Sequence, residues 1–312
     1  MKAIPIRALW MFPFLAIACG SASQLGTQSS ISSVTSLTLS APSGVTMQVA
    51  EEHSAPSLWL SVPDEPSGRH AVLILLPEHL TVRRHNTSRA EHLYFWHPGK
   101  GVARPQWLRA GNALQYEKDL APGIHFLVRA SLQPDGVLVH YEVVNNSGID
   151  FDSVQAITDP RMVSLLFHDV RLERTYVHGP GGFILLAADM PDRVKMPLNE
   201  WLPNRYRISY SLPVENERIE KRPDGTRVFN ALNRSDEPVI ATLSNDGQWI
   251  MATFSRNPGN LWTNPDLTCQ HADPEISLPH QSTGSAEEKI LLFRGTLDDL
   301  LQKVRKQRDL LK

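Results

Sequence analysis

Three stretches of the chain concentrate the histidine, aromatic and charged side chains that could carry chemistry. The first covers residues 83–99. If it is an extended strand, His92 and Trp96 point to the same face. Aromatic rings stack on the C–H faces of sugars and imidazole nitrogens bond hydroxyls, so we predict His92, Trp96 and His97 as substrate-binding residues. The alternative is a sandwich strand with its larger side chains turned inward.

The second stretch covers residues 167–178 and places His168 directly before Asp169. A histidine beside a carboxylate is suited to proton transfer or to metal binding. We therefore predict His168 and Asp169 as catalytic residues, with Arg171 and Arg174 binding substrate. As a strand, the stretch would turn His168 and Asp169 to opposite faces. The alternative is a surface ladder in which the charged residues pair with one another.

The third stretch covers residues 260–274 and has little strand character at its start, which predicts a loop. Loops that carry tryptophan, histidine and aspartate side chains, as this one does, often hold ligands. We predict Trp262 as a substrate-binding residue and His271 and Asp273 as catalytic residues. Cys269 is interpreted as a small buried hydrophobic residue rather than a nucleophile.

Metal binding is a second interpretation of the same residues. His168, His271 and Asp273 together would suit zinc or iron. No short-spaced ligand pair supports such a site, and polar clusters are usually satisfied by hydrogen bonds. We therefore predict no metal and no cofactor. The sequence also lacks the G-x-S-x-G, H-E-x-x-H, Walker and G-x-G-x-x-G motifs, and secreted serine hydrolases and zincins are therefore disfavoured.

The elements that must position these residues are short β-like segments separated by turn signals. Residues 71–76 form a continuous apolar run, as in a strand buried on both faces. Residues 124–132 and 137–144 are joined at Pro134-Asp135-Gly136 and predict a hairpin. The same pattern continues in later segments, namely 205–212, 226–232, 239–243, 249–254 and 289–294. The sequence therefore predicts an all-β fold, a large antiparallel β-sandwich.

One helix is predicted, over residues 296–312 at the C-terminus. Leu297, Leu300, Leu301 and Val304 lie at helical spacing behind Thr296, which is a good N-cap residue. We expect the apolar stripe to pack on the sandwich. Binding of a partner protein is the alternative for this face.

The N-terminus predicts export. Lys2 and Arg7 precede an apolar run over residues 8–19 that is too short to span a bilayer, and small residues follow it. We predict a signal peptide over 1–23, a tether over 24–40 and a single β-sandwich domain over 41–312. The alternative for the end of the tether is a first strand over 34–39. The destination would be the periplasm or cell envelope. Two processing routes stay open: lipidation of Cys19, which would anchor the chain to the membrane, or ordinary cleavage after Ser23.

The charge and cysteine content of the chain restrict the kinds of partner that it could have. The formal net charge is −2, and no basic patch indicates a nucleic-acid partner. The chain has 2 cysteines. Either processing route removes Cys19 from disulfide chemistry, so Cys269 should be left without a partner. The oligomeric state cannot be inferred from the sequence.

Residues 135–147, read D-G-V-L-V-H-Y-E-V-V-N-N-S, resemble the central strand and turn of the galactose mutarotase-like group, which includes the aldose 1-epimerases. The resemblance implies a β-supersandwich, a sugar ligand and a catalytic histidine near the position of His168. The epimerase signature Asn-His-x-Tyr-Phe-Asn is absent after Asn145. The C-terminal glutamate base of the family has no clear counterpart, because His271 and Asp273 occupy that region.

These observations lead to two hypotheses. The first is an exported carbohydrate-binding or carbohydrate-active protein, with the sugar on a concave sheet face lined by histidine, tryptophan and arginine. Whether it is an enzyme stays open; an epimerase or other isomerase, a lyase and a hydrolase all fit. The second is a non-enzymatic envelope lipoprotein that acts as a protein-interaction scaffold. Proximity of His92, His168 and His271 around one cleft would favour a small-molecule site, whereas wide separation of the three would favour the scaffold.

Overall fold

The computed structural model describes residues 37–51, 55–63, 65, 67–96, 103–190 and 195–312. These residues belong to one compact unit, Ser36–Lys312. The expected signal peptide with Cys19, the tether up to residue 36 and the candidate His97 lie outside the described residues.

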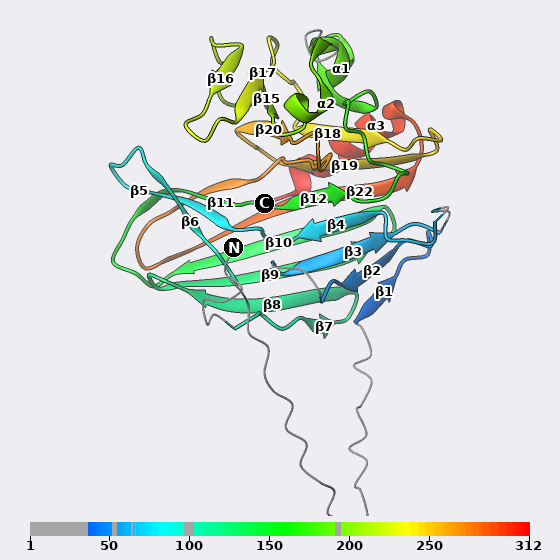
Figure 1. The fold of residues 1–312 in the computed structure, drawn as a ribbon. Coiled ribbons are helices and arrows are strands. Elements are labelled where there is room, and N and C mark those ends of the chain that lie inside the picture. Colours follow the sequence, from blue (N-terminus) through cyan, green and yellow to red (C-terminus); the bar gives the residue numbers. More distant parts are fainter. Residues whose placement is uncertain (1–36, 52–54, 64, 66, 97–102, 191–194) are drawn as a thin grey trace, which may run out of the picture. The chain divides into compact units, whose positions relative to one another are not determined.

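A nine-stranded sheet forms one layer of the sandwich (Figure 1). Its two long central strands, β10 (Gly136–Asn145) and β22 (Ser282–Arg294), pair antiparallel along ten residues. On one side of this pair follow β9 (Ile124–Gln133), β8 (Ala113–Leu120) and β7 (Leu108–Ala110). On the other side follow β19 (Trp249–Ser255), β18 (Val239–Leu243), β13 (Thr175–Gly179) and β14 (Gly182–Leu185).

A five-stranded sheet contributes the other side of the main hydrophobic core. Its strands, in spatial order, are β1 (Thr38–Ser40), β2 (Thr46–Val49), β3 (Ser57–Ser61), β4 (Val72–Leu75) and β12 (Asp159–Met162). Residues of β4 are buried at every position, as predicted from the continuous apolar run. The main core joins residues of this sheet, such as Leu58 and Ile74, to residues of the large sheet, such as Phe126 and Tyr141.

Two four-stranded sheets complete the β structure. One consists of β21 (Glu275–Leu278), β11 (Phe151–Ala156), β5 (Leu80–Arg84) and β6 (Ala90–Leu93). The other consists of β16 (Ile219–Lys221), β17 (Arg227–Asn230), β15 (Arg205–Ser209) and β20 (Asn260–Thr263). Two short helices, α1 (Leu186–Asp189) and α2 (Leu198–Trp201), precede the second sheet in the chain. Trp201, Tyr206 and Phe229 belong to a second, separate hydrophobic cluster.

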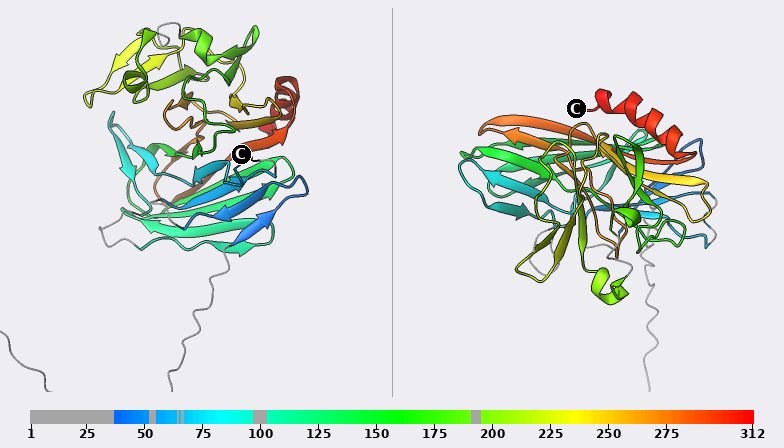
Figure 2. Two further views of the ribbon diagram at one scale, coloured as in Figure 1. Left: turned by 45° about the vertical axis from the view of Figure 1, so that its right-hand side comes forward. Right: turned by 90° about the horizontal axis from the view of Figure 1, so that it is seen from above.

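The C-terminal helix α3 (Leu297–Gln307) continues into a 3₁₀ turn, Arg308–Leu310. Thr296 caps it in a full capping box with Asp299, so the start predicted from the sequence is confirmed. Its buried residues Leu300 and Val304 pack with residues of β18, β19 and β22. Figure 2 shows α3 lying along these strands of the large sheet. The expected packing of the apolar stripe on the sandwich is therefore confirmed.

The predicted fold class, an all-β antiparallel sandwich with a C-terminal helix, is confirmed. Among the described strands, only β15 and β17 pair parallel. The turn at Pro223-Asp224-Gly225 joins β17 to β16, a strand that the sequence pattern did not predict. None of the helices in the described ranges is long and apolar enough to cross a bilayer.

Two local expectations were wrong. Residues 168–174 form turns rather than a strand. The carboxylate of Asp169 accepts the N–H groups of Glu173 (3.0 Å) and Arg174 (2.8 Å), which closes the chain into a turn. The start of the third stretch is a strand, β20, rather than a loop, because its backbone pairs with β15.

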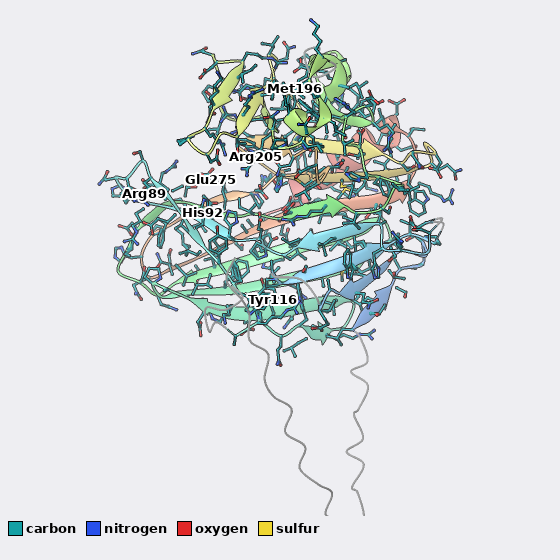
Figure 3. All side chains as sticks on the ribbon, viewed as in Figure 1. Arg89, His92, Tyr116, Met196, Arg205 and Glu275 are labelled. Carbon is teal, nitrogen blue, oxygen red and sulfur yellow. The ribbon has the colours of Figure 1, made fainter. Side chains whose placement is uncertain are left out.

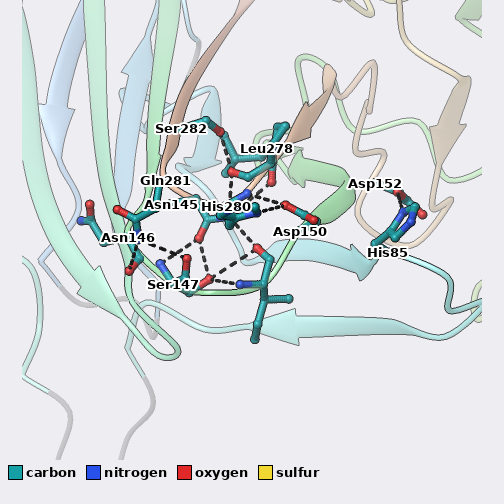
Figure 4. Close-up of polar contacts among 12 residues, drawn as sticks. His85, Asn145, Asn146, Ser147, Asp150, Asp152, Leu278, His280, Gln281 and Ser282 are labelled. Carbon is teal, nitrogen blue, oxygen red and sulfur yellow. Dashed lines mark hydrogen bonds and ion pairs between the residues drawn. The ribbon is translucent and has the colours of Figure 1, made fainter.

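The turns at the two ends of β10 are fixed, one by the backbone of a glycine and the other by an asparagine side chain. Gly136 has φ +139°, and a Cβ atom there would lie 2.1 Å from the carbonyl oxygen of Ile290. At the other end, the buried amide of Asn145 donates to the carbonyls of Ile149, Leu278 and Pro279 and accepts from Ser147 (Figure 4). The predicted turn after Asn145 therefore also ties β10 to the chain that leads into β22.

Candidate functional site

Polar side chains from three distant parts of the chain meet where β4, β5 and β12 come together. Backbone pairing sets their positions, because Asp159 of β12 lies opposite Leu75 at the end of β4. The N–H of Gln270 donates to the carbonyl of Pro160, which brings residues 269–273 beside β12. We call the following six residues the central polar cluster: Glu78, His79, His92, Asp159, Arg161 and His271.

The rings of His79 and His92 and the neighbouring ring of Tyr94 form the outer border of the cluster. The rings of His79 and His92 meet edge to face with centroids 4.5 Å apart, and the ring of Tyr94 lies 5.5 Å from that of His79. Tyr94 is 52% exposed, and His92 on β6 is exposed as well. Thr81 Oγ1 lies 3.2 Å from His92 Nδ1, which orients that ring. Solvent-accessible aromatic surface therefore adjoins the charged part of the cluster.

Arg161 connects two carboxylates in the cluster. Its guanidinium donates to Asp159 Oδ2 at 2.6 Å and to Glu78 Oε1 at 3.3 Å. Asp159 is only 2% exposed, and burying a carboxylate costs free energy. The positive charge of Arg161 offsets this cost. Arg205, at the start of β15, acts electrostatically on both Glu78 and His79. Figure 3 shows the positions of Arg205 and His92 in this region.

His271 forms the inner part of the cluster. Its Nε2 lies 3.2 Å from Cys269 Sγ and 3.7 Å from Asp159 Oδ1, and its Nδ1 lies 3.6 Å from Asp273 Oδ2. The backbones of His271 and Trp262 exchange two hydrogen bonds of 3.0 Å. This pairing ties the backbone of His271 to that of Trp262 in the third predicted stretch, 260–274.

A buried carboxyl group lies behind His271. Asp273 accepts the N–H of Thr158 at 2.9 Å, and the hydroxyl of Thr158 donates to Glu288 in the middle of β22. Glu288 is fully buried, and burial raises its pKa well above the usual range. Burial likewise raises the pKa of Asp273. Both side chains are therefore poised to hold a proton more readily than exposed carboxyl groups.

The ionisation of the cluster follows from burial and neighbouring charge. Burial, assisted by the nearby His92 and His271, lowers the pKa of His79 to about 4. Burial and the neighbouring Asp159 raise the pKa of Glu78. Burial alone would lower the pKa of His271, but Cys269 and Asp273 raise it well above its usual range. His79 is therefore a neutral hydrogen-bonding group at neutral pH, whereas His271 favours its protonated form.

The structure brings part of the predicted site together. His271 and Asp273 lie side by side, and His79 connects them electrostatically and by ring contact to His92. Trp262 joins them through its backbone pairing, and its ring lies under the guanidinium groups of Arg207 and Arg222.

The other predicted residues make their contacts elsewhere. His168 Nε2 lies 3.1 Å from the carbonyl oxygen of Asp266, and the carboxylate of Asp169 holds the turn described above. Arg174 donates to the carbonyls of Leu166, His168 and Leu243, and Arg171 donates to the carbonyl of Met196. Trp96 lies 5.4 Å below the guanidinium of Arg104.

Sequence reasoning missed Glu78, His79, Asp159, Arg161 and Glu288. A signal was present for two of them, because Glu78 and His79 follow directly after a continuous apolar run, where a buried strand ends. For Asp159 and Arg161, no local pattern distinguishes them from ordinary surface charges. Only the pairing of β12 with β4 reveals their position.

Similar proteins are found by comparison of structures and not by comparison of sequences. No family model and no curated protein matches the sequence. The chain is similar to a solved galactose mutarotase-like protein from Lactobacillus casei (12% identity, covering 82% of this chain and 99% of that chain, TM-score 0.47). It is also similar to a galactose mutarotase related enzyme from Lactobacillus acidophilus (12% identity, covering 84% and 98%, TM-score 0.45).

A third similar structure is a polysaccharide lyase (10% identity, covering 84% of this chain and 34% of that chain, TM-score 0.39). The resemblance to the galactose mutarotase-like group that the sequence indicated is thus confirmed as a resemblance. The functional argument depends on the cluster itself.

Proposed function

We propose that the protein is exported and binds a carbohydrate at the central polar cluster. The observation that carries the proposal is the contact of the accessible rings of His92 and Tyr94 with His79, beside the Glu78–Arg161–Asp159 ion pairs. Sugars present apolar C–H faces and dense hydroxyl groups on the same small molecule. A site for them therefore needs ring faces and bidentate polar groups next to one another.

Each part of the cluster has a role in such a complex. Tyr94 and His92 would stack on a pyranose ring. His79 is neutral at neutral pH, so its imidazole can donate one hydrogen bond and accept another from a hydroxyl. Arg161 and Glu78 would form hydrogen bonds with neighbouring hydroxyls of the same sugar. Asp159 and His271 lie deeper and would hold these groups in place.

Proton transfer to a bound sugar is compatible with the arrangement. His271 favours its protonated form, and Glu78 has a raised pKa at the edge of the cluster. Such a pair of groups is what general acid–base chemistry requires. We propose binding as the function and acid–base chemistry as the activity to be tested on any sugar that binds.

Isothermal calorimetry of the mature protein against neutral, acidic and amino sugars tests the proposal. We expect saturable binding of at least one class, weakened about tenfold or more by His92→Ala or Arg161→Met, which corresponds to about 1.4 kcal/mol. His125→Ala is the matched control, because His125 also pairs with a carboxylate, Asp119, but lies on β9 away from the cluster. Silence across all three classes would favour the scaffold hypothesis.

The cellular destination is a separate part of the proposal. Residues 1–23 have the charge and apolar pattern of a signal peptide, with Cys19 or Ser23 marking the cleavage site. Mass spectrometry of the protein recovered from cell envelopes distinguishes the two routes, because lipidation leaves an acylated Cys19 as the first residue. Recovery of the uncleaved chain from the cytosol would overturn export.

A further inference from the structure

Three side chains of different chemistry converge behind the proposed sugar site. Asp159, Cys269 and His271 each turn one potential ligand atom to the same point, and these atoms all lie within 4.8 Å of one another. The sulfur of Cys269 lies 3.2 Å from His271 Nε2, which lies 3.7 Å from Asp159 Oδ1. Donor atoms on one tetrahedral zinc ion lie about 3.3–3.6 Å apart, given zinc–ligand bonds of about 2.0–2.3 Å.

A second observation concerns the oxygen that faces this point. The two carboxylate oxygens of Asp159 have different surroundings: Oδ2 accepts from Arg161, whereas Oδ1 is buried and has no hydrogen-bond partner. A buried carboxylate oxygen without a partner costs free energy, and native proteins rarely leave one so. A cation between Oδ1, the imidazole and the sulfur would satisfy it.

We propose that Asp159, Cys269 and His271 bind a divalent transition-metal ion, with zinc as the best fit to this donor set. Thiolate, imidazole and carboxylate are all established zinc ligands, and thiolate disfavours magnesium and calcium. Three protein ligands leave one tetrahedral position for water or for a hydroxyl of a bound molecule. The inference does not depend on the proposed sugar ligand. Zinc on Nε2 would displace the proton that His271 holds in the metal-free chain, so metal binding and proton donation by His271 exclude one another.

Neighbouring side chains hold two of the three proposed ligands, His271 and Asp159, in position. The other imidazole nitrogen of His271, Nδ1, faces Asp273 at 3.6 Å, and a carboxylate in that place orients a metal-bound histidine. Asp273 is itself fixed by the N–H of Thr158. Arg161 holds the far oxygen of Asp159 and so aims Oδ1 at the same point.

The proposal differs from the ligand set that the sequence suggested and did not favour. That set contained His168, His271 and Asp273. The structure directs His168 to the carbonyl of Asp266, and it places Asp273 on the opposite nitrogen of His271. Asp159 enters the set only through the pairing of β12 with β4, which sequence spacing cannot show.

The test uses the mature protein without a polyhistidine tag, kept reduced and equilibrated with zinc, followed by removal of loosely bound ions. Elemental analysis should find about one zinc per chain. Replacement of zinc by cobalt(II) should give a thiolate-to-cobalt charge-transfer band in the near ultraviolet. Cys269→Ser should abolish that band, and His271→Ala and Asp159→Asn should lower the zinc content at least tenfold.

His178→Ala is the matched control, because His178 is also buried and paired with an aspartate, Asp236, outside the cluster. It should retain the full zinc content. The wild-type protein decides the matter even where a variant fails to fold: less than a tenth of an equivalent of zinc together with no cobalt band overturns the proposal. Full zinc binding by a folded Cys269→Ser variant overturns it as well.

Discussion

Asp159 shows how one residue organises the centre of this molecule. It is 2% exposed, its Oδ2 accepts from Arg161, and its Oδ1 faces His271. The same carboxylate therefore belongs both to the ion pairs that border the proposed sugar site and to the proposed metal site. Replacing Asp159 or Arg161 should disturb both.

The Arg161–Asp159 ion pair should contribute strongly to stability. Arg161→Met leaves the Asp159 carboxylate buried without its cation, so we expect a loss of about 3 kcal/mol in the free energy of unfolding. Arg84→Met is the control, because the bridge from Arg84 to Glu91 is between half-exposed side chains and should be worth under about 1 kcal/mol. Urea denaturation measures both. Equal effects of the two substitutions would contradict the prediction.

His79 should make the protein sensitive to mild acid. Its pKa is about 4 in the folded chain and near 6.5 when unfolded, so between these values only the unfolded state binds the proton. Protonation of His79 in the unfolded state therefore does not reduce the free energy of unfolding above pH 6.5. It reduces that free energy progressively as the pH falls toward 4.

Nuclear magnetic resonance of the ring protons should show His79 titrating near pH 4. Denaturation of wild type and His79→Gln at several pH values separates its contribution from that of the carboxyl groups. The difference between the two proteins should change between pH 6.5 and 4 and stay constant above pH 7. A His79 titration near 6.5 would show that the ring is accessible to water.

At the scale of elements, a helix or hairpin could be predicted where the interactions that determine it are local in sequence. The C-terminal helix and the β9–β10 hairpin were predicted because their signals are local: a capping residue with an apolar stripe, and a Pro-Asp-Gly turn. The segment 168–174 was misread because the Asp169 carboxylate bonds the backbone ahead of it, a contact that strand periodicity does not reveal.

The site was harder to predict than the elements. His92, His271 and Asp273 were identified from their residue types, but their partners come from strands far away in sequence. Asp159 lies opposite Leu75, and Glu288 reaches Thr158 across 130 residues. A pattern along the chain carries no information about such pairings.

The hairpin turn between β9 and β10 should tolerate no side chain at Gly136. Gly136→Ala would place a Cβ 2.1 Å from the carbonyl of Ile290 at a φ of +139°, so we expect a loss of about 3 kcal/mol or more. Gly111→Ala is the matched control: its φ is +66°, but nothing lies within 4 Å, so about 1 kcal/mol is expected. Thermal denaturation compares the two, and a larger loss at Gly111 would contradict this account.

At the scale of the whole molecule, α3 joins parts of the chain that are distant in sequence. Asp135 in the β9–β10 turn accepts from Lys289 of β22 and from Gln307 of the helix. Glu237, which is 5% exposed, pairs with Arg305 and Arg308. The helix therefore covers the large sheet and hydrogen-bonds Asp135, and together with the 3₁₀ turn that follows it neutralises the buried charge of Glu237.

Weakening this contact should destabilise the whole sheet. Leu300 and Val304 are fully buried, so Leu300→Ala and Val304→Ala should each cost about 2–4 kcal/mol. Leu310→Ala is the control, because Leu310 is 77% exposed and its loss should stay within about 0.5 kcal/mol. Circular dichroism melts of the three variants provide the measurement. Unchanged melting of the two buried variants would mean that α3 is only loosely attached.

The position of β22 has a consequence for how the protein is made. This strand follows all the other described strands in the chain, yet it lies between β10 and β19 near the centre of the nine-stranded sheet. Until it arrives, both neighbours present open edges and the main core lacks Ile290 and Leu292. The nine-stranded sheet therefore cannot be completed before β22 has been synthesised. Such a delay would suit the export proposed above, in which the chain crosses the membrane before it folds.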